Sequence, residues 1–221
     1  MTSQAIKEKY DLEVMPISIR GKRLELYALS NWDAFVRNLE EKGEAYIREF
    51  PFWIKVWEAS IVLADHLCQL GWDKQKQILE IGAGMGIAGL FLGASGHRVT
   101  ITDYDDDALQ LLQMNVELNK LRHVHVKKLD WNAPDLDEKY DVICGSELLY
   151  RETFIDPLVR LLKEYLRPGG TAIFAHDARR MCLMKFIGMV PGRFEIQNTG
   201  KTLRGEDEVH KVLIHTLHLK E

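Results

Sequence analysis

The sequence predicts an α/β fold in which helices doubly wind a mostly parallel sheet of seven strands. From residue 77 onward, short apolar runs typical of buried strands alternate with helix-compatible segments. A glycine-rich turn joins the first of these strands to the next helix, as in nucleotide-binding α/β folds. The chain ends in two strand-like runs, 193–197 and 209–219, that read as a hairpin, so the last strand is expected to be antiparallel.

Length and composition fit one globular enzyme domain. The 221 residues match the size of a single α/β domain, which we divide into an accessory part, 1–50, and a core, 51–221. A net charge of −4 disfavours general nucleic-acid binding, and no apolar run is long enough to span a membrane. The N-terminus lacks the apolar centre of a signal peptide, and the three cysteines form no C-x-x-C pair. These features predict a reducing, cytoplasmic location.

The accessory part is expected to contain a β-hairpin and a helical extension. Residues 12–19 and 23–27 alternate as strands do, and Arg20, Gly21 and Lys22 connect them. Residues 31–42 read as a polar-faced helix. An amphipathic helix, 58–70, follows and stops at Gly71.

The core elements follow from the same patterns. In order they are strand 77–82, helix 86–95, strand 97–103, helix 105–119, and strands 123–130, 140–146 and 171–175. Before the last of these strands we expect a helix with Asp156 as N-cap and Pro157 in its first turn, ending at Pro168-Gly169-Gly170. A further helix is expected around 178–189.

The turn after the first core strand is the strongest indication of a ligand. Glu80 lies near the end of that strand, and Gly82, Gly84 and Gly86 follow at alternate positions. Glycines allow the backbone to approach a ligand closely, and the amides that begin the next helix favour a nucleotide-like ligand. A dinucleotide fingerprint would need glycine at 87, where this chain has Ile87. A tight turn without a ligand is the alternative.

Polar residues also follow the second and third core strands. Asp103 ends the second strand, where a carboxylate can accept hydrogen bonds from both ribose hydroxyls. Tyr104 comes next, and the acids at 105–107 are expected to cap the following helix. Asp130 and Trp131 follow the third strand, where they are candidates to contact an adenine amino group and ring.

Several motifs together resemble the seven-β-strand protein-lysine methyltransferases. The G-x-G-x-G turn is similar to motif I of S-adenosylmethionine (SAM) methyltransferases, and residues 140–150, YDVICGSELLY, resemble the family stretch FDLILGADVVY. The family's tryptophan-bearing segment, its LDW and its PGG are similar to residues 53–57, 129–131 and 168–170. In one departure, Glu147 stands where the family has Asp in its Asp-x-x-Tyr motif.

The resemblance implies a Rossmann-like SAM-dependent methyltransferase that acts on a protein lysine and releases S-adenosylhomocysteine. Glu147 and Tyr150 are then the catalytic candidates at the substrate mouth, and no metal is expected. The implied cofactor-binding residues are Trp57, Glu80, Gly82, Gly84, Gly86, Asp103, Tyr104, Asp130, Trp131 and Ser146. Trp53 is a further candidate for the cofactor or lysine channel.

Alternatives remain open at this point. Trp53 and Trp57 also fit one face of a packed helix, and Tyr150 fits a core tyrosine. His176-Asp177 fits either a substrate-proximal loop or a helix cap. The alternatives to a protein-lysine methyltransferase are a methyltransferase of a small amine or other metabolite, and a non-catalytic SAM-binding interaction protein. A nucleic-acid adenine methyltransferase is disfavoured because residues 145–148 contain no proline.

Overall fold

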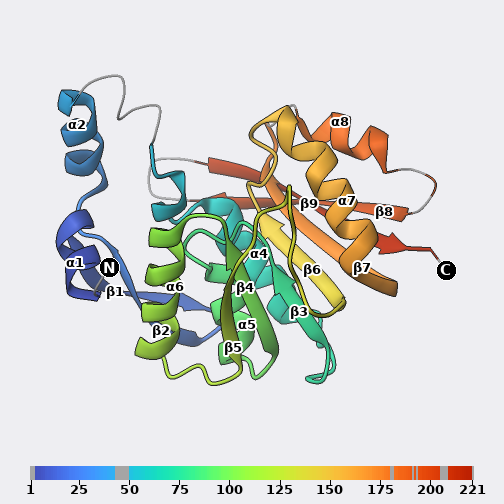
Figure 1. Cartoon of the computed structure of the whole chain (residues 1–221), viewed down its shortest axis with the longest axis horizontal. Helices are drawn as coiled ribbons and strands as arrows, with labels where there is room; N and C mark the ends of the chain where they lie inside the picture. The colour runs from blue at the N-terminus through green and yellow to red at the C-terminus, as the bar shows by residue number, and fades with distance from the viewer. Residues whose placement is uncertain are drawn as a thin grey trace.

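The structure is a computed structural model that describes residues 3–42, 50–179, 182–190, 192, 194–204 and 209–220 (Figure 1). Its main sheet has seven strands in the spatial order β5-β4-β3-β6-β7-β9-β8. These strands are β3 (Gln77–Glu80), β4 (Arg98–Asp103), β5 (Val124–Lys128), β6 (Tyr140–Ser146), β7 (Leu166–Asp177), β8 (Phe194–Arg204) and β9 (Val209–Leu219). Every neighbouring pair from β5 to β7 is parallel, and β9 is antiparallel to both β7 and β8. The mostly parallel sheet with an antiparallel C-terminal strand is therefore confirmed.

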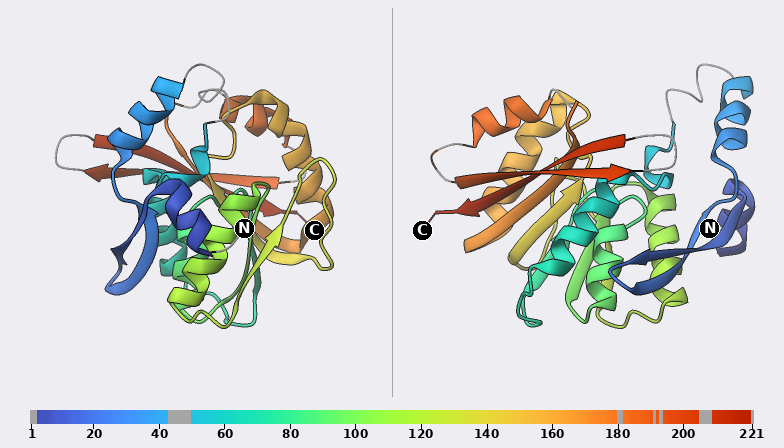
Figure 2. Two further views of the ribbon diagram at one scale, coloured as in Figure 1. Left: turned by 60° about the vertical axis from the view of Figure 1, so that its left-hand side comes forward. Right: turned by 180° about the vertical axis from the view of Figure 1, so that it is seen from behind.

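Helices cover both faces of this sheet, as Figures 1 and 2 show. One apolar layer contains side chains of α4 (Glu58–Gln69), α5 (Ile87–Ala94) and α6 (Asp106–Leu118). The other contains side chains of α7 (Ile155–Tyr165), and α8 (Cys182–Met189) lies on the same side. The fold is thus doubly wound, as expected.

Consecutive strand residues alternate between these two layers. In β3, Ile78 packs with α4–α6, whereas Leu79 packs toward α7 and α8. In β6, Val142 and Ile143 divide in the same way. This alternation follows from the pleat of a strand, and burial on both faces explains the continuous apolar runs in the sequence.

The N-terminal part forms a separate two-stranded hairpin of β1 (Leu12–Ile19) and β2 (Lys22–Leu29), followed by α2 (Trp32–Lys42). Two asparagines of α6 and its C-terminal end bind the free edge of β2. Asn119 accepts from the Glu25 amide at 2.9 Å and donates to the Glu25 carbonyl at 2.6 Å. Asn115 accepts from the Tyr27 amide at 2.8 Å. These bonds dock the hairpin on the core because they satisfy backbone groups that would otherwise stay unpaired.

The structure corrects the expected limits of two elements, α7 and β7. Phe154, and not Asp156, is the N-cap of α7, so Asp156 lies in the first turn with Pro157 after it. The helix ends at Tyr165, and β7 begins at Leu166 with a shift in register before Val142 and Thr171 pair.

An unexpected helix, α1 (Ser3–Tyr10), precedes the hairpin. Its polar sequence concealed it, because only Ile6 and Tyr10 are buried. Among the described residues, no helix is both long and apolar enough to cross a membrane.

Candidate active site

A cavity of about 710 Å³ opens at the carboxyl ends of β3, β4, β5 and β6. Parallel α/β sheets bind their ligands at this edge. The expected site residues that line it are Trp53, Trp57, Gly82, Gly84, Asp103, Tyr104, Asp130, Trp131, Ser146, Glu147 and Tyr150. Glu80 and Gly86 do not line it. The topology thus gathers residues that are up to about a hundred positions apart into one hollow.

The glycine turn after β3 has no room for side chains. Gly82 and Gly84 both have a positive φ of 54°, a conformation that other residues adopt only with strain. A Cβ on Gly82 would lie 2.9 Å from Leu148 and 3.2 Å from the Trp131 ring. A Cβ on Gly84 would lie 2.8 Å from the Trp53 carbonyl oxygen. Both glycines line the cavity, and the missing side chains let the turn pass between Trp53 and Trp131.

Asp103 holds this turn to the end of β4. One carboxylate oxygen accepts from the Gly84 amide at 2.8 Å, and the other accepts from the amides of Tyr104 and Asp105. Burial raises the pKa of Asp103, and the hydrogen bonds from the three backbone amides oppose that rise. The carboxylate lines the cavity, where it has acceptor capacity for the hydroxyls of a bound ribose.

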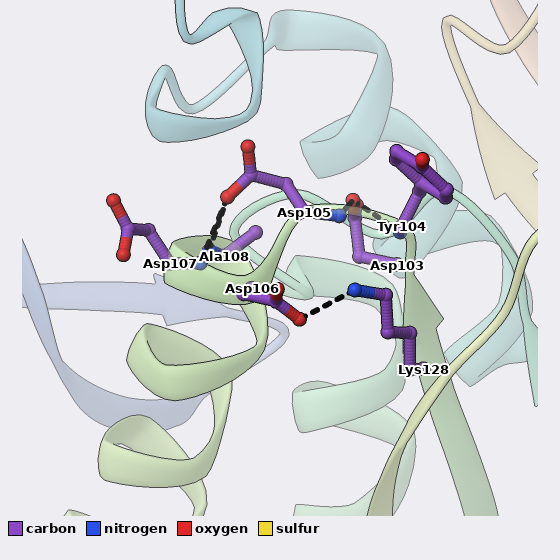
Figure 3. Close-up of polar contacts among 7 residues, drawn as sticks. All are labelled: Asp103, Tyr104, Asp105, Asp106, Asp107, Ala108 and Lys128. Carbon is purple, nitrogen blue, oxygen red and sulfur yellow. Dashed lines mark hydrogen bonds and ion pairs between the residues drawn. The ribbon is translucent and has the colours of Figure 1, made fainter. Parts of the chain in front are cut away.

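The helix after Asp103 begins as the sequence predicts (Figure 3). Asp105 is the N-cap of α6 and accepts from the amides of Asp107 and Ala108 at 2.8 and 3.1 Å. Asp106 pairs with Lys128 of the adjacent strand at 2.7 Å. These bonds fix the turn that carries Asp103 and Tyr104.

Glu80 does not line the cavity but holds the first turn of α5 behind it. It is 1% exposed and accepts from the Gly89 amide in the first turn of α5 at 2.7 Å. Gly86, the N-cap of α5, has no side chain to cap this helix, so the strand residue Glu80 provides the acceptor. Burial raises the pKa of Glu80 to about 8, against the lowering effect of the helix amides.

Asp130 and Trp131, which follow β5, form one wall of the cavity. The Trp131 ring lies against Gly82 and meets Phe154 edge-on, with 5.8 Å between ring centroids. Asp130 accepts from the backbone and side-chain nitrogens of Asn132 at 2.8 and 3.1 Å. This wall offers a carboxylate beside an aromatic face, the pair expected for an adenine.

Glu147, at the end of β6, has a strained and fixed position. Its φ is +54°, which is uncommon for a residue other than glycine and costs backbone strain. Its amide donates to the Ala175 carbonyl at 2.9 Å, and its Oε1 accepts from the Asp177 amide at 2.7 Å. The C-terminal end of β7 therefore orients this carboxylate.

Aromatic side chains surround the mouth of the cavity. Tyr150 is 46% exposed, so it is not a core tyrosine, and its ring lies 5.0 Å from Phe154 and 6.3 Å from Phe52. Trp53 lies in the short 3-10 turn η1 (Phe52–Ile54), and Trp57 directly precedes α4, so the two do not share one helix face. The Trp57 indole donates to the Phe52 carbonyl at 2.9 Å. These contacts give the mouth a rigid aromatic rim.

Sequence reasoning missed several lining residues. Phe52, Lys55, Leu148, Arg151 and Phe154 all line the cavity, and only their closeness to the motifs could have indicated them. A second cavity, of about 430 Å³, shares Lys55, Trp57 and Glu147 with the first and also includes Asp177. His176 and Asp177 both lie in β7 itself, so the loop and the helix cap expected for them are both wrong; the strand continues to Asp177, whose end of β7 borders this second cavity.

The residues present fit a SAM-like cofactor. The glycine turn lines the cavity without side chains, Asp103 provides a carboxylate beside it, and Trp131 provides an aromatic wall. The cavity volume lies in the range usual for cofactor sites. No group of three or more histidine, cysteine, aspartate or glutamate side chains suited to a metal occurs in the part of the chain that the structure describes.

Comparisons with known proteins agree with this geometry. Over 115 residues, 48% of this chain and 53% of the relative, the sequence is 39% identical to Protein N-lysine methyltransferase METTL21A of Xenopus tropicalis. It is 28% identical over 208 residues, 90% of this chain and 92% of the relative, to EEF1A lysine methyltransferase 3 of the same organism. The chain spans about half the length of several of the curated relatives it matches.

The fold also matches solved structures. A ribosomal protein L11 methylase from Lactobacillus delbrueckii superimposes with a TM-score of 0.59 at 21% identity, over 76% of this chain and 81% of the other. This likeness shows the fold alone. Residues 51–193 match the family described as lysine methyltransferase. The resemblance seen in the sequence is thereby confirmed, and the chain belongs to the lysine methyltransferase family.

Proposed function

We propose that this chain transfers a methyl group from SAM to the side-chain amine of a lysine in a protein acceptor. One observation carries the proposal: the cofactor cavity contains a fixed carboxylate, Glu147, within an aromatic rim. When bound, SAM supplies a methyl group that is already activated by its sulfonium. The protein then has mainly to align the nucleophile and exclude water.

The residues of this chain suit a lysine amine. A lysine must lose its proton before it can attack, because its usual pKa is about 10.4. Glu147 can accept hydrogen bonds from the amine and orient it, while Tyr150 and Phe52 provide faces that attract a cationic or methylated nitrogen. Glu147 and Tyr150 are therefore the proposed catalytic residues.

The cofactor roles follow from the same geometry. Gly82 and Gly84 are proposed to contact the amino-acid end of SAM, Asp103 its ribose, and Asp130 and Trp131 its adenine. Tyr104, Ser146 and Trp57 complete the proposed lining. Glu80 and Gly86 are proposed to act indirectly, by holding the first turn of α5.

We further propose that residues 1–221 form one methyltransferase domain with an accessory part at 1–50. The proposed partner is a protein rather than a nucleic acid or a membrane, and the proposed location is the cytoplasm. The net charge of −4 and the resemblance to protein-lysine methyltransferases support these proposals.

Variants of Glu147 test the catalytic proposal. Glu147→Ala should leave S-adenosylhomocysteine affinity within about twofold while lowering turnover by roughly a hundredfold, because the lost interaction orients the nucleophile. Glu147→Asp restores the family residue and should retain part of the activity. Normal turnover of Glu147→Ala on its true acceptor would remove Glu147 from the mechanism.

A small-molecule acceptor is the second candidate. The same Glu147 variants would affect it equally, so these kinetics cannot separate the two acceptor classes. Mass spectrometry that locates the transferred methyl group separates them: a methylated lysine Nε in a protein supports the proposal, and a methylated small amine supports the second candidate.

A further inference from the structure

Helix α1 lies outside residues 51–193, the part that matches the family. Nothing in the proposed chemistry uses it, and none of its residues lines either cavity. Nevertheless its last residue, Tyr10, is only 8% exposed and contacts two segments that border the cofactor side of the cavity.

The first contact is with the beginning of α6. The Tyr10 hydroxyl donates to Asp107 Oδ2 at 2.7 Å, and Lys9 contacts the same oxygen. Asp107 lies in the first turn of α6, four residues after Asp103, and its amide is held by the N-cap Asp105 (Figure 3). Burial and the Asp107 contact raise the pKa of Tyr10, so the phenol remains a neutral donor.

The second contact is with Trp53, which lines the cavity. The Tyr10 and Trp53 rings meet edge-on, with centroids 5.2 Å apart and planes at 81°. Trp53 Nε1 is buried and has no hydrogen-bond partner among the described residues. Because no hydrogen bond orients the indole, packing has to do so, and the Tyr10 ring is one of the apolar side chains against which it packs.

Trp53 in turn rests on the glycine turn. Its carbonyl oxygen and Cα lie 2.8 and 3.3 Å from the position that a Cβ of Gly84 would take. The Gly84 amide donates to Asp103, and Asp103 leads directly into α6. Tyr10 therefore contacts both ends of a continuous chain of contacts. That chain runs from Trp53 through Gly84 and Asp103 to the start of α6.

We propose that α1 is part of the cofactor site, and that Tyr10 is a positioning residue that holds Trp53 against the glycine turn and ties it to α6. Tyr10 does not touch the cavity, so its effect on the cofactor passes through Trp53 and through the turn at Asp103. Cofactor affinity should then depend on an aromatic ring at position 10.

Calorimetric titration of the full chain with S-adenosylhomocysteine tests the proposal without knowledge of the acceptor. Tyr10→Leu removes both contacts and should raise the dissociation constant roughly tenfold, mostly through faster release. Tyr10→Phe keeps the ring and should cost about twofold to threefold. Lys9→Ala is the matched control: it removes the exposed partner of Asp107 and the exposed ammonium 5.0 Å from the Tyr10 ring centroid but leaves that ring and its hydroxyl in place, so it should change the constant by less than about twofold.

A purely structural helix would behave differently. If α1 only stabilised the fold, the Tyr10 variants would melt at a lower temperature, but well below that temperature they would bind S-adenosylhomocysteine with an unchanged dissociation constant. Unchanged affinity in folded Tyr10→Leu, or an equal loss in Lys9→Ala, would overturn the proposal. If Tyr10→Leu does not fold, Tyr10→Met, which has a longer and more adaptable side chain but neither ring nor hydroxyl, should show the same loss of affinity, and unchanged affinity in that variant would equally overturn the proposal.

Discussion

Replacing Glu80 by glutamine should remove much of the pH dependence of stability at neutral pH. Burial raises the pKa of Glu80 from 4.5 to about 8. Between these two values the native protein holds a proton that the unfolded chain has released. The free energy of unfolding therefore falls as the pH rises through this window, by about 1.4 kcal/mol per pH unit. Over the whole window the loss is at most roughly 5 kcal/mol.

Urea unfolding of the wild type and of Glu80→Gln between about pH 5 and pH 8 measures this effect. Glutamine stays neutral and keeps an oxygen for the Gly89 amide. The difference between the two proteins therefore isolates the charge of Glu80. The variant should gain stability relative to the wild type as the pH rises. If the free energy of unfolding of the two proteins changed in parallel with pH, or if the variant became less stable than the wild type at higher pH, the reasoning would be refuted. The lowering effect of the helix amides on the Glu80 pKa would then equal or exceed the raising effect of burial.

Three further changes test the cofactor side of the cavity. Asp103→Ala should weaken S-adenosylhomocysteine binding about tenfold or more in calorimetry, because it removes both a ribose acceptor and the bond to the Gly84 amide; unchanged affinity in a folded variant would exclude Asp103 from the site. Asp130→Ala should raise the same dissociation constant about tenfold, the loss of roughly one hydrogen bond, whereas a change in stability alone would make Asp130 structural. Gly84→Ala should lower the melting temperature and weaken binding at least tenfold, because its Cβ would meet the Trp53 carbonyl at 2.8 Å in a positive-φ position; a variant with normal affinity would show that the turn can shift without harm.

The sequence was sufficient to predict the core sheet because its signals are local and consistent. Buried parallel strands give continuous apolar runs, and a strand followed by spaced glycines indicates a β–α turn. The same logic placed Asp103, Asp130 and Glu147 together, since parallel strands present their carboxyl ends at one edge. All three line the cavity.

What could not be predicted depends on contacts between distant segments. Helix α1 has a polar sequence, and its place is fixed by Tyr10 and Lys9 against Asp107, 97 and 98 positions away. The sequence predicted Glu80 as a cofactor-binding residue. In the structure its carboxylate instead accepts from the Gly89 amide of α5, because Gly86 has no side chain to cap that helix. The strained backbone of Glu147 and its bond to the Asp177 amide have no local signature.

The central claim is that the methyl group goes to a lysine side chain of a protein. The direct measurement is to incubate the chain with SAM carrying an isotopically labelled methyl group and a protein extract of its own source, and then to locate the label by peptide mass spectrometry. Glu147→Ala, shown to bind S-adenosylhomocysteine normally, is the control. We expect label on the Nε of lysine in a discrete protein, and loss of that label with Glu147→Ala. Label confined to small molecules, or to histidine or arginine side chains, would contradict it.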